Sequence, residues 1–154
     1  MDKTNIHGQF KLDCYKTDGS LKWTTGWIPN STMNAALAVF SGLAGNTGSQ
    51  TAFTYLALGT SSTAVVASQT TLGAEISDSG LERAAATVSR VTTTQTNDTL
   101  QLAKTWTASG TKAIEEIGYF NAASTGVMGG RALTTTKNIV SGETITATYK
   151  IQFA

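Results

Sequence analysis

The sequence has few charged residues and very little proline, cysteine or histidine. Charged residues make up 14% of the 154-residue chain, below the ~25% typical of soluble domains, and proline, cysteine and histidine each occur once. The single cysteine, Cys14, excludes an internal disulfide and fits a reducing compartment. One histidine (His7) and one distant cysteine cannot supply the ligands of a metal site, so we expect no metal and no other cofactor.

Clusters of one charge and long apolar runs are also missing. The formal net charge is +1, and the lysines and arginines are scattered from Lys3 to Lys150, so no basic stripe is available for nucleic acid. No run approaches the ~20 apolar residues of a membrane span. The N-terminal stretch MDKTNIHGQF has no apolar core of an export signal. We therefore expect no nucleic-acid partner, no membrane association and no signal-directed export.

Threonine, serine and 15 glycines take the place of the missing charge. Threonine is β-branched and suits pleated surfaces, so the composition predicts an all-β chain with hydroxyl-bearing outer faces. Low surface charge is common where a protein lies against other subunits. The length fits one domain, residues 1–154, in which a hairpin and helix (8–44) pack on or extend a main β-sandwich (53–154).

Residues 8–28 are predicted to form a β-hairpin. Apolar and polar residues alternate on its first arm, at Phe10, Leu12 and Cys14. The dipeptide Asp18-Gly19 is a turn signal, and apolar residues resume on the second arm, at Leu21, Trp23 and Trp27. Pro29 is expected to end the hairpin, because proline cannot donate to a strand ladder. In this interpretation Cys14 is a buried small hydrophobe rather than a nucleophile.

One short α-helix is predicted near residues 31–44. Asn30, Ser31 or Thr32 is the expected N-cap, and Gly42 or Gly45 the expected stop. Helical spacing places four residues on one face, which we expect to pack on a sheet: Met33, Leu37, Phe40 and Ala44.

From residue 53 onward the apolar period changes to two, which favours an antiparallel β-sandwich. FTYLALGT is a predicted strand that leads into a loop of small polar residues. The stretch 81–94 is predicted to be one strand with a single face formed by Ala84, Ala86, Val88 and Arg90. Asn97-Asp98 marks a turn before a strand with an apolar face at Leu100, Leu102 and Trp106. The clearest strand is the last, where the apolar positions are Ile145, Ala147, Tyr149, Ile151 and Phe153.

The stretch EEIGYFNAASTGVMGGRAL contains acids, glycines and an arginine, which raises the question of an active site. Adjacent strand side chains point to opposite faces, so Glu115 and Glu116 are not expected to flank one glycosidic bond. GVMGGR lacks the spacing of a phosphate-binding loop. Arg131 is predicted to pair with Glu115 or Glu116 across a hairpin. No base is placed to activate a nucleophile, so we do not expect an enzyme.

Three tryptophans remain, at positions 23, 27 and 106. Trp106 continues an apolar face and is predicted to be core. Trp23 and Trp27 share parity in one predicted strand, so both could be core, a subunit interface or a ligand platform. Sequence reasoning leaves these three alternatives open.

Four stretches carry a resemblance to a known family: GSLKWTTGWIPNSTMNAALAVFSGLAG, YLALGTSSTAVVASQTTLGAE, IEEIGYFNAASTGVMGGRAL and SGETITATYKIQFA. In their order and spacing, the chain resembles small tailed-bacteriophage virion proteins, labelled capsid cement (decoration) proteins or tail-fibre proteins. Tyr119 departs from the smaller aliphatic residue expected there. The family carries no catalytic residues to transfer.

The resemblance implies a virion structural protein made in the bacterial host cytoplasm. As a cement protein it would be a β-sandwich homotrimer on the outer capsid surface, bridging subunits of the major capsid protein. The alternative is a tail-fibre or baseplate-associated receptor-binding module whose exposed aromatics contact host glycan. Candidate subunit or capsid contacts are Tyr15, Trp23, Trp27 and Arg131.

Overall fold

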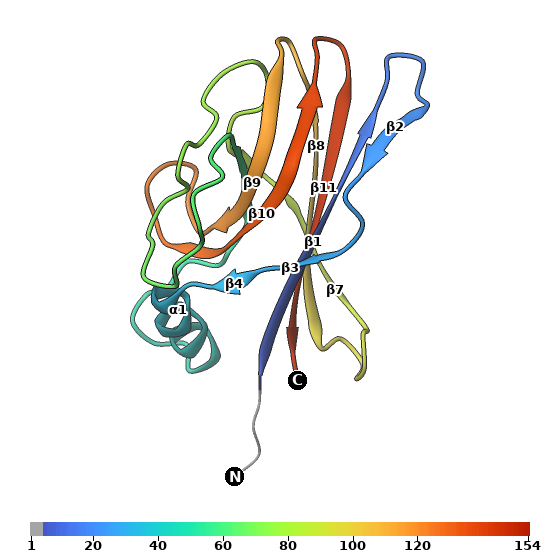
Figure 1. The fold of residues 1–154 in the computed structure, drawn as a ribbon. Helices are drawn as coiled ribbons and strands as arrows, with labels where there is room; N and C mark the ends of the chain where they lie inside the picture. Colours follow the sequence, from blue (N-terminus) through green and yellow to red (C-terminus); the bar gives the residue numbers. More distant parts are fainter. Residues whose placement is uncertain (1–4) are drawn as a thin grey trace.

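Two antiparallel β-sheets pack face to face in the computed structural model, which describes residues 5–154 (Figure 1). Sheet A has the strand order β2-β1-β11-β8-β7, and β3 also pairs with β1. Its strands are β1 (Ile6–Tyr15), β2 (Leu21–Thr24), β3 (Ile28–Pro29), β7 (Thr87–Val91), β8 (Thr99–Thr107) and β11 (Thr144–Phe153). Sheet B has the order β4-β10-β9-β5-β6. Its strands are β4 (Ser31–Thr32), β5 (Tyr55–Gly59), β6 (Ala84–Ala85), β9 (Lys112–Phe120) and β10 (Met128–Ile139).

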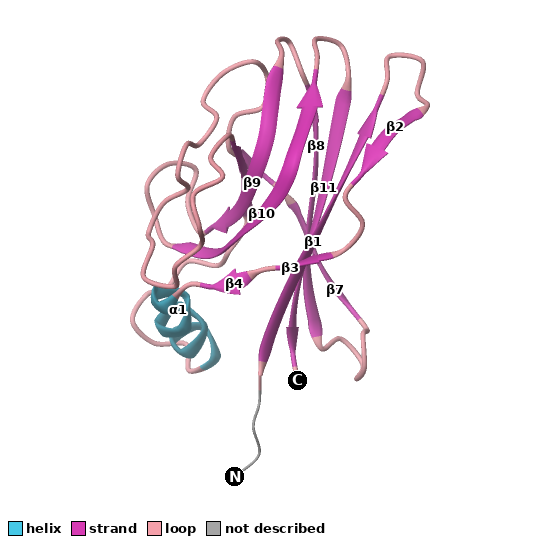
Figure 2. Cartoon of the chain, viewed as in Figure 1, coloured by secondary structure: helices cyan, strands magenta, loops and turns pink. Residues whose placement is uncertain are grey.

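One helix, α1 (Asn34–Ala44), lies at the lower end of the sandwich in Figure 2, whereas the β1–β2 turn lies at the upper end. The prediction of an all-β fold with one short helix is confirmed.

The main core fills the space between the two sheets. Alternate residues of sheet A point into it, as the period-two pattern predicted: Phe10, Leu12, Cys14, Leu102, Trp106, Ile145, Ala147, Tyr149 and Ile151. Sheet B contributes Leu56, Leu58, Ile114, Ile117, Tyr119, Ala132 and Ile139. Each fully buried aliphatic or aromatic side chain of this kind contributes about 1.5–3 kcal/mol to folding. Phe153 is the exception to the predicted alternation, since 40% of its surface is exposed where β11 ends.

The predicted hairpin is confirmed over β1 and β2, but the chain changes course after Thr24. Gly19 takes a positive φ of 83° in the turn, beside an Asp18 carboxylate that accepts hydrogen bonds from Ser20. Pro29 is the last residue of β3, as predicted, although it still pairs with Gln9. Proline is tolerated there since β3 occupies an edge position on the same side of β1 as β2.

Helix α1 begins later than predicted. Ser31 and Thr32 pair with β10 as β4, so Met33 becomes the N-cap residue and no side chain caps the helix. The stop at Gly45 is confirmed. The predicted apolar face is wrong at Leu37, which is 52% exposed, and at Ala44, which is also exposed.

The helix instead buries a face of small residues, namely Ala36, Val39 and Gly42. Small residues allow the helix backbone to approach its neighbours, and a Cβ on Gly42 would lie 2.9 Å from the Thr47 carbonyl oxygen. Phe40 packs partly buried against Phe53 and Phe153, with ring centroids 5.1 and 5.4 Å away.

The single strand predicted over residues 81–94 is wrong. The chain crosses between the sheets at this point, so Ala84–Ala85 pairs with β5 in sheet B and Thr87–Val91 pairs with β8 in sheet A. At the crossing, the Ala86 N–H donates to the Thr54 carbonyl oxygen.

Residues 60–83, which we call the cover segment, cross the outer face of sheet B (green in Figure 1). Leu72 of this segment joins a second apolar cluster, formed with Met33, Ala57, Phe120 and Met128. Sheet B is therefore apolar on both faces, although the sequence predicted only a polar loop here.

Candidate contact surface

The outer face of sheet A carries mainly threonine, glutamine and lysine side chains. Strand alternation and the pairing of β1, β11 and β8 place these residues together: His7, Gln9, Lys11, Asp13, Tyr15, Gln101, Ala103, Thr105, Thr107, Thr144, Thr146, Thr148, Lys150 and Gln152. The Thr105 and Thr146 hydroxyls are hydrogen-bonded across strands at 2.7 Å. The loop 92–98 folds over a corner of this face, at Thr99 and Gln152.

Trp27 is the large aromatic residue on this face. It is 43% exposed, and the Lys150 and Lys11 ammonium groups lie 4.9 and 5.6 Å from the centroid of its ring. Lys11 is also paired with Asp13 at 3.0 Å. Cation–π contacts of this kind contribute about 0.5–1 kcal/mol at exposed sites and hold the ring in place. An exposed, positioned tryptophan is the residue type most often found as an interface anchor.

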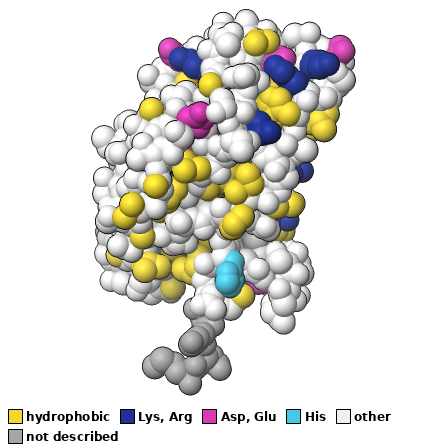
Figure 3. All heavy atoms as spheres, in the orientation of Figure 1, with side chains coloured by type: hydrophobic (Ala, Val, Ile, Leu, Met, Phe, Trp, Pro, Cys, Tyr) yellow, Lys and Arg dark blue, Asp and Glu magenta, His cyan; other side chains and the backbone are white. Residues whose placement is uncertain are grey.

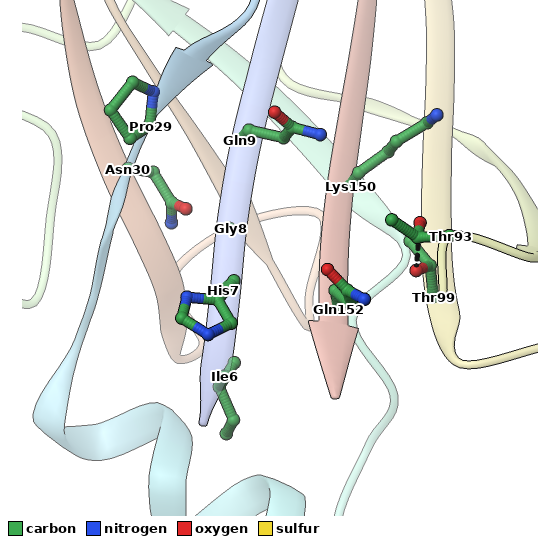
Figure 4. Close-up of a pocket in the computed structure, with 10 residues that line it drawn as sticks. All are labelled: Ile6, His7, Gly8, Gln9, Pro29, Asn30, Thr93, Thr99, Lys150 and Gln152. Atoms are coloured by element: carbon green, nitrogen blue, oxygen red, sulfur yellow. Dashed lines mark hydrogen bonds between the residues drawn. The ribbon is translucent and has the colours of Figure 1, made fainter. Parts of the chain in front are cut away.

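A polar hollow of about 320 Å³ lies on the same face of sheet A (Figure 4). Its walls come from the beginning of β1, the end of β11, Pro29 and Asn30, and the loop before β8. His7, Gln9, Lys150 and Gln152 contribute polar side chains, and a Thr93–Thr99 hydrogen bond of 2.7 Å closes one side. The hollow therefore offers donors and acceptors to a ligand or partner.

The structure separates the two tryptophans that the sequence placed on one strand. A bend at Gly26, with a positive φ of 64°, lies between β2 and Trp27. Trp23 packs against the main core, and its Nε1 donates to the Asn138 carbonyl oxygen at 2.9 Å. Trp23 is therefore part of the sandwich edge, whereas Trp27 lies on the outer face. The prediction that they share one strand face is wrong.

Tyr15, a predicted contact residue, and Trp106, a predicted core residue, lie in different environments. Tyr15 is half-buried at the end of β1, on the same face as Lys11 and Asp13. Trp106 is buried, as predicted, and its Nε1 donates to the Glu82 carbonyl oxygen at 2.8 Å.

Arg131 is completely buried, so its prediction as a contact residue is wrong. Its Nε donates to Glu116 at 2.6 Å, which confirms the predicted pairing across the hairpin with Glu116 rather than Glu115. Its Nη1 donates to Gln69 at 2.9 Å, so the guanidinium also binds the cover segment.

Glu116 binds the cover segment as well. Its carboxylate accepts backbone N–H bonds from Gly73 at 3.0 Å and Ala74 at 2.7 Å. Glu115 is only half-buried and accepts a hydrogen bond from Thr136. The two acids thus have separate structural partners.

Arg83 forms a second attachment that sequence reasoning missed. Its guanidinium binds both Glu75 oxygens at 2.6 and 2.8 Å and stacks 3.5 Å from the centroid of the Phe120 ring. It also donates to the carbonyl oxygens of Ala122 and Thr125. Charge-assisted bidentate bonds are strong and geometrically specific, so the loop 122–126 is held by its own chain. In the sequence, the only indication of this attachment was the presence of Glu75 and Arg83 in the cover segment, which otherwise consists mainly of small residues.

Charged side chains visible in Figure 3 gather mostly at the upper end of the molecule, where Lys22 pairs with Glu143 at 2.8 Å.

Burial, and then the nearby Glu143 carboxylate, raise the pKa of Cys14 to about 11. The thiol therefore stays protonated at neutral pH, which agrees with a structural role.

No protein-family model, curated protein or solved structure matches this chain. Among residues 5–154, no three His, Cys, Asp or Glu side chains are grouped so that they could hold a metal ion. No helix in the described part of the chain has the length and apolar character needed to cross a membrane.

Proposed function

We propose that the protein is a bacteriophage virion structural protein that binds the outer capsid surface as a cement protein and bridges major capsid protein subunits. The observation that carries this proposal is the outer face of sheet A, which residues 5–154 leave largely uncovered and which presents Trp27, held by Lys11 and Lys150, on a surface rich in threonine and glutamine. The resemblance of four sequence stretches to phage virion proteins supplies the partner. We infer no catalytic activity, since the buried acids and the thiol serve the fold.

The composition of the outer face of sheet A suits a broad, dry contact. Threonine and glutamine side chains offer hydrogen bonds, and few full charges have to be desolvated when this face is covered. Charged residues are depleted in interface cores, whereas aromatic residues are enriched there. Trp27 would be the anchor, and Tyr15 lies on the same face.

Assembly into a homotrimer would strengthen binding to a shell through multivalency. Several modest contacts made together can exceed the affinity of one contact by about 10²–10⁴. Because each copy would bind assembled shell better than free capsid protein, many bound copies would stabilise the shell by mass action. Light scattering tests the trimer directly, and a protein that stays monomeric on capsids as well as in solution would contradict it.

The experiment for capsid binding mixes purified protein with expanded, undecorated capsids of the encoding phage and measures bound protein after sedimentation. We expect saturable binding and greater resistance of decorated capsids to heat. Trp27→Ala is expected to weaken binding, because it removes the anchor.

Val66→Ala is the matched control. Val66 is also exposed but lies in the cover segment, so this variant should bind like the unmodified protein. The proposal is wrong if neither the unmodified protein nor the control binds capsids. If the unmodified protein and the Trp27→Ala variant bind capsids equally well, the outer face of sheet A is not the contact surface.

A tail-associated receptor-binding module is the second candidate, and the polar hollow on the outer face of sheet A favours it. In this function, the amide side chains that line the hollow, with Trp27 on the same face, would bind a host glycan. Binding to host cells or to their surface glycans, without binding to capsids, would select this function over the first.

A further inference from the structure

An apolar groove of about 620 Å³ lies between α1 and the β7 edge of sheet A. Apolar side chains form most of its walls: Phe40, Leu43, Ala44, Ala52, Phe53, Val88, Leu100 and Phe153. Leu43, Val88 and Phe153 remain 40%, 44% and 40% exposed. The volume falls within the ~300–1,000 Å³ range of ligand-binding clefts. Exposed apolar surface gathered in one groove marks an interaction site more often than scattered residues do.

The strand beside the groove is open along one side. β7 pairs with β8 from Thr87 to Val91 and is the last strand of sheet A. Within residues 5–154, no backbone or side-chain hydrogen bond outside this pairing involves Thr87–Val91. In an edge strand, alternate N–H and C=O groups point away from the sheet and are free to pair with an added strand.

The groove also contains a cation that makes no ion pair within residues 5–154, namely Arg90. Val88 and Arg90 alternate along β7, and both line the groove. No carboxylate within residues 5–154 lies within ion-pairing distance of Arg90.

Asp98 also lines the groove, and its carboxylate is held by hydrogen bonds within the chain. Its carboxylate accepts hydrogen bonds from five groups, belonging to Thr93, Thr94, Gln95, Thr99 and Gln152. The groove is therefore mainly apolar, and Arg90 is its cation without an ion pair, whereas the hydrogen-bonding capacity of the Asp98 carboxylate is used within the chain.

We propose that this groove binds an extended segment of another protein that adds to the β7 edge and bears apolar side chains and one carboxylate. The segment's backbone would pair with β7, its alternate side chains would fill the space between Val88 and Leu43, and its carboxylate would bind Arg90. This mode of recognition combines main-chain hydrogen bonds for affinity with side-chain pockets for specificity. The groove is distinct from the outer face of sheet A, so the inference does not depend on capsid binding.

The test uses the full chain and a short fluorescein-labelled peptide that alternates valine and serine around one glutamate. A matched peptide carries glutamine in place of glutamate, and another carries the glutamate with alternate backbone amides methylated. Fluorescence anisotropy is expected to show saturable binding of the glutamate peptide, up to about fivefold tighter than that of the glutamine peptide. The methylated peptide is expected not to bind, because it cannot complete a strand ladder.

Variants then assign the binding to the groove. Arg90→Gln should abolish the preference for glutamate, and Leu43→Ser should weaken both unmethylated peptides. Lys16→Gln, at the β1–β2 turn, is the matched control and should leave binding unchanged. Circular dichroism confirms that each variant is folded.

Absence of saturable binding overturns the proposal, and so does binding that Arg90→Gln and Leu43→Ser leave intact. Self-association that Leu43→Ser disrupts, without peptide binding, would instead assign the groove to a second copy of the chain. Because the assay contains no capsid, its failure is separate from failure of the cement function.

Discussion

The two sheets are built alike but differ on their outer faces. The outer face of sheet B is closed by the cover segment, which adds an apolar cluster and a buried ion pair. The outer face of sheet A is polar, rich in threonine and largely left uncovered by residues 5–154. The difference shows that both faces of sheet B are buried within the fold, whereas sheet A keeps one polar face exposed.

The cover segment has almost no regular secondary structure, so its position depends on side chains. Leu72 provides the apolar contact, while Arg131 and Glu116 bind the segment from within sheet B. Desolvating a buried ion pair of this kind costs free energy. Removing only one partner destabilises the fold strongly, because the other charge is then buried and unpaired. Replacements on the two outer faces should therefore have very different costs.

The largest effect is expected for Arg131→Ala. The change leaves the Glu116 carboxylate buried without its counter-charge, so the free energy of unfolding should fall by about 3–5 kcal/mol. Urea denaturation followed by circular dichroism measures it. Lys150→Ala, which removes a cation from the outer face of sheet A, should cost about 1 kcal/mol or less. A loss below ~1 kcal/mol for Arg131→Ala would mean that backbone N–H groups alone satisfy Glu116.

Leu72→Ala should have the next largest effect. Truncating this buried side chain leaves a cavity against Phe120 and Met128, at a cost of about 2–4 kcal/mol. Val66→Ala, at an exposed position in the same segment, should change the free energy of unfolding by ~0.5 kcal/mol or less. Equal effects in urea denaturation would show that the cover segment does not pack as a second core.

Acid should weaken the corner of sheet A that Asp98 holds. Hydrogen bonds, led by the Gln95 backbone N–H, keep the pKa of the Asp98 carboxyl well below its usual range. A depressed folded-state pKa stabilises the fold above the unfolded pKa of about 3.9, and this contribution is lost as the pH falls below it.

The urea midpoint should therefore decline between about pH 5 and pH 2, and Asp98→Asn should have a shallower decline. Identical pH profiles for the two proteins would show that Asp98 does not contribute. Lowered pKa values at Glu143 and Asp78 leave some acid sensitivity in the variant.

Apart from the control variants, the smallest effect on stability is expected for Trp27→Ala. The cation–π contacts with Lys11 and Lys150 contribute about 1 kcal/mol or less, because the ring is partly exposed. Urea denaturation should barely change even though capsid binding falls. A loss above ~2 kcal/mol would instead make Trp27 a structural residue of sheet A.

Local patterns predicted the regular parts of the fold well. Period-two alternation identified the inward faces of β1 and β11, since each strand residue alternates between core and exterior whatever its partner. The pairing of Arg131 with Glu116 followed from their expected positions on neighbouring strands.

Prediction from local patterns failed where contacts between residues distant in the sequence determine the structure. The pairing of β4 with β10 moved the start of α1, and the bend at Gly26 separated Trp23 from Trp27. The crossing between sheets at Ala86 also divided an apparently continuous alternating stretch.

By itself, the sequence determined the β-rich class, the single short helix and the absence of an internal disulfide, because these depend on composition and local period. Only the tertiary structure decided which sheet face the small-residue stretch 60–83 covers. That choice depends on a buried carboxylate binding the backbone N–H groups of Gly73 and Ala74, and on Arg131 reaching Gln69. Such contacts join residues that are distant in the chain, so no local sequence pattern predicts them.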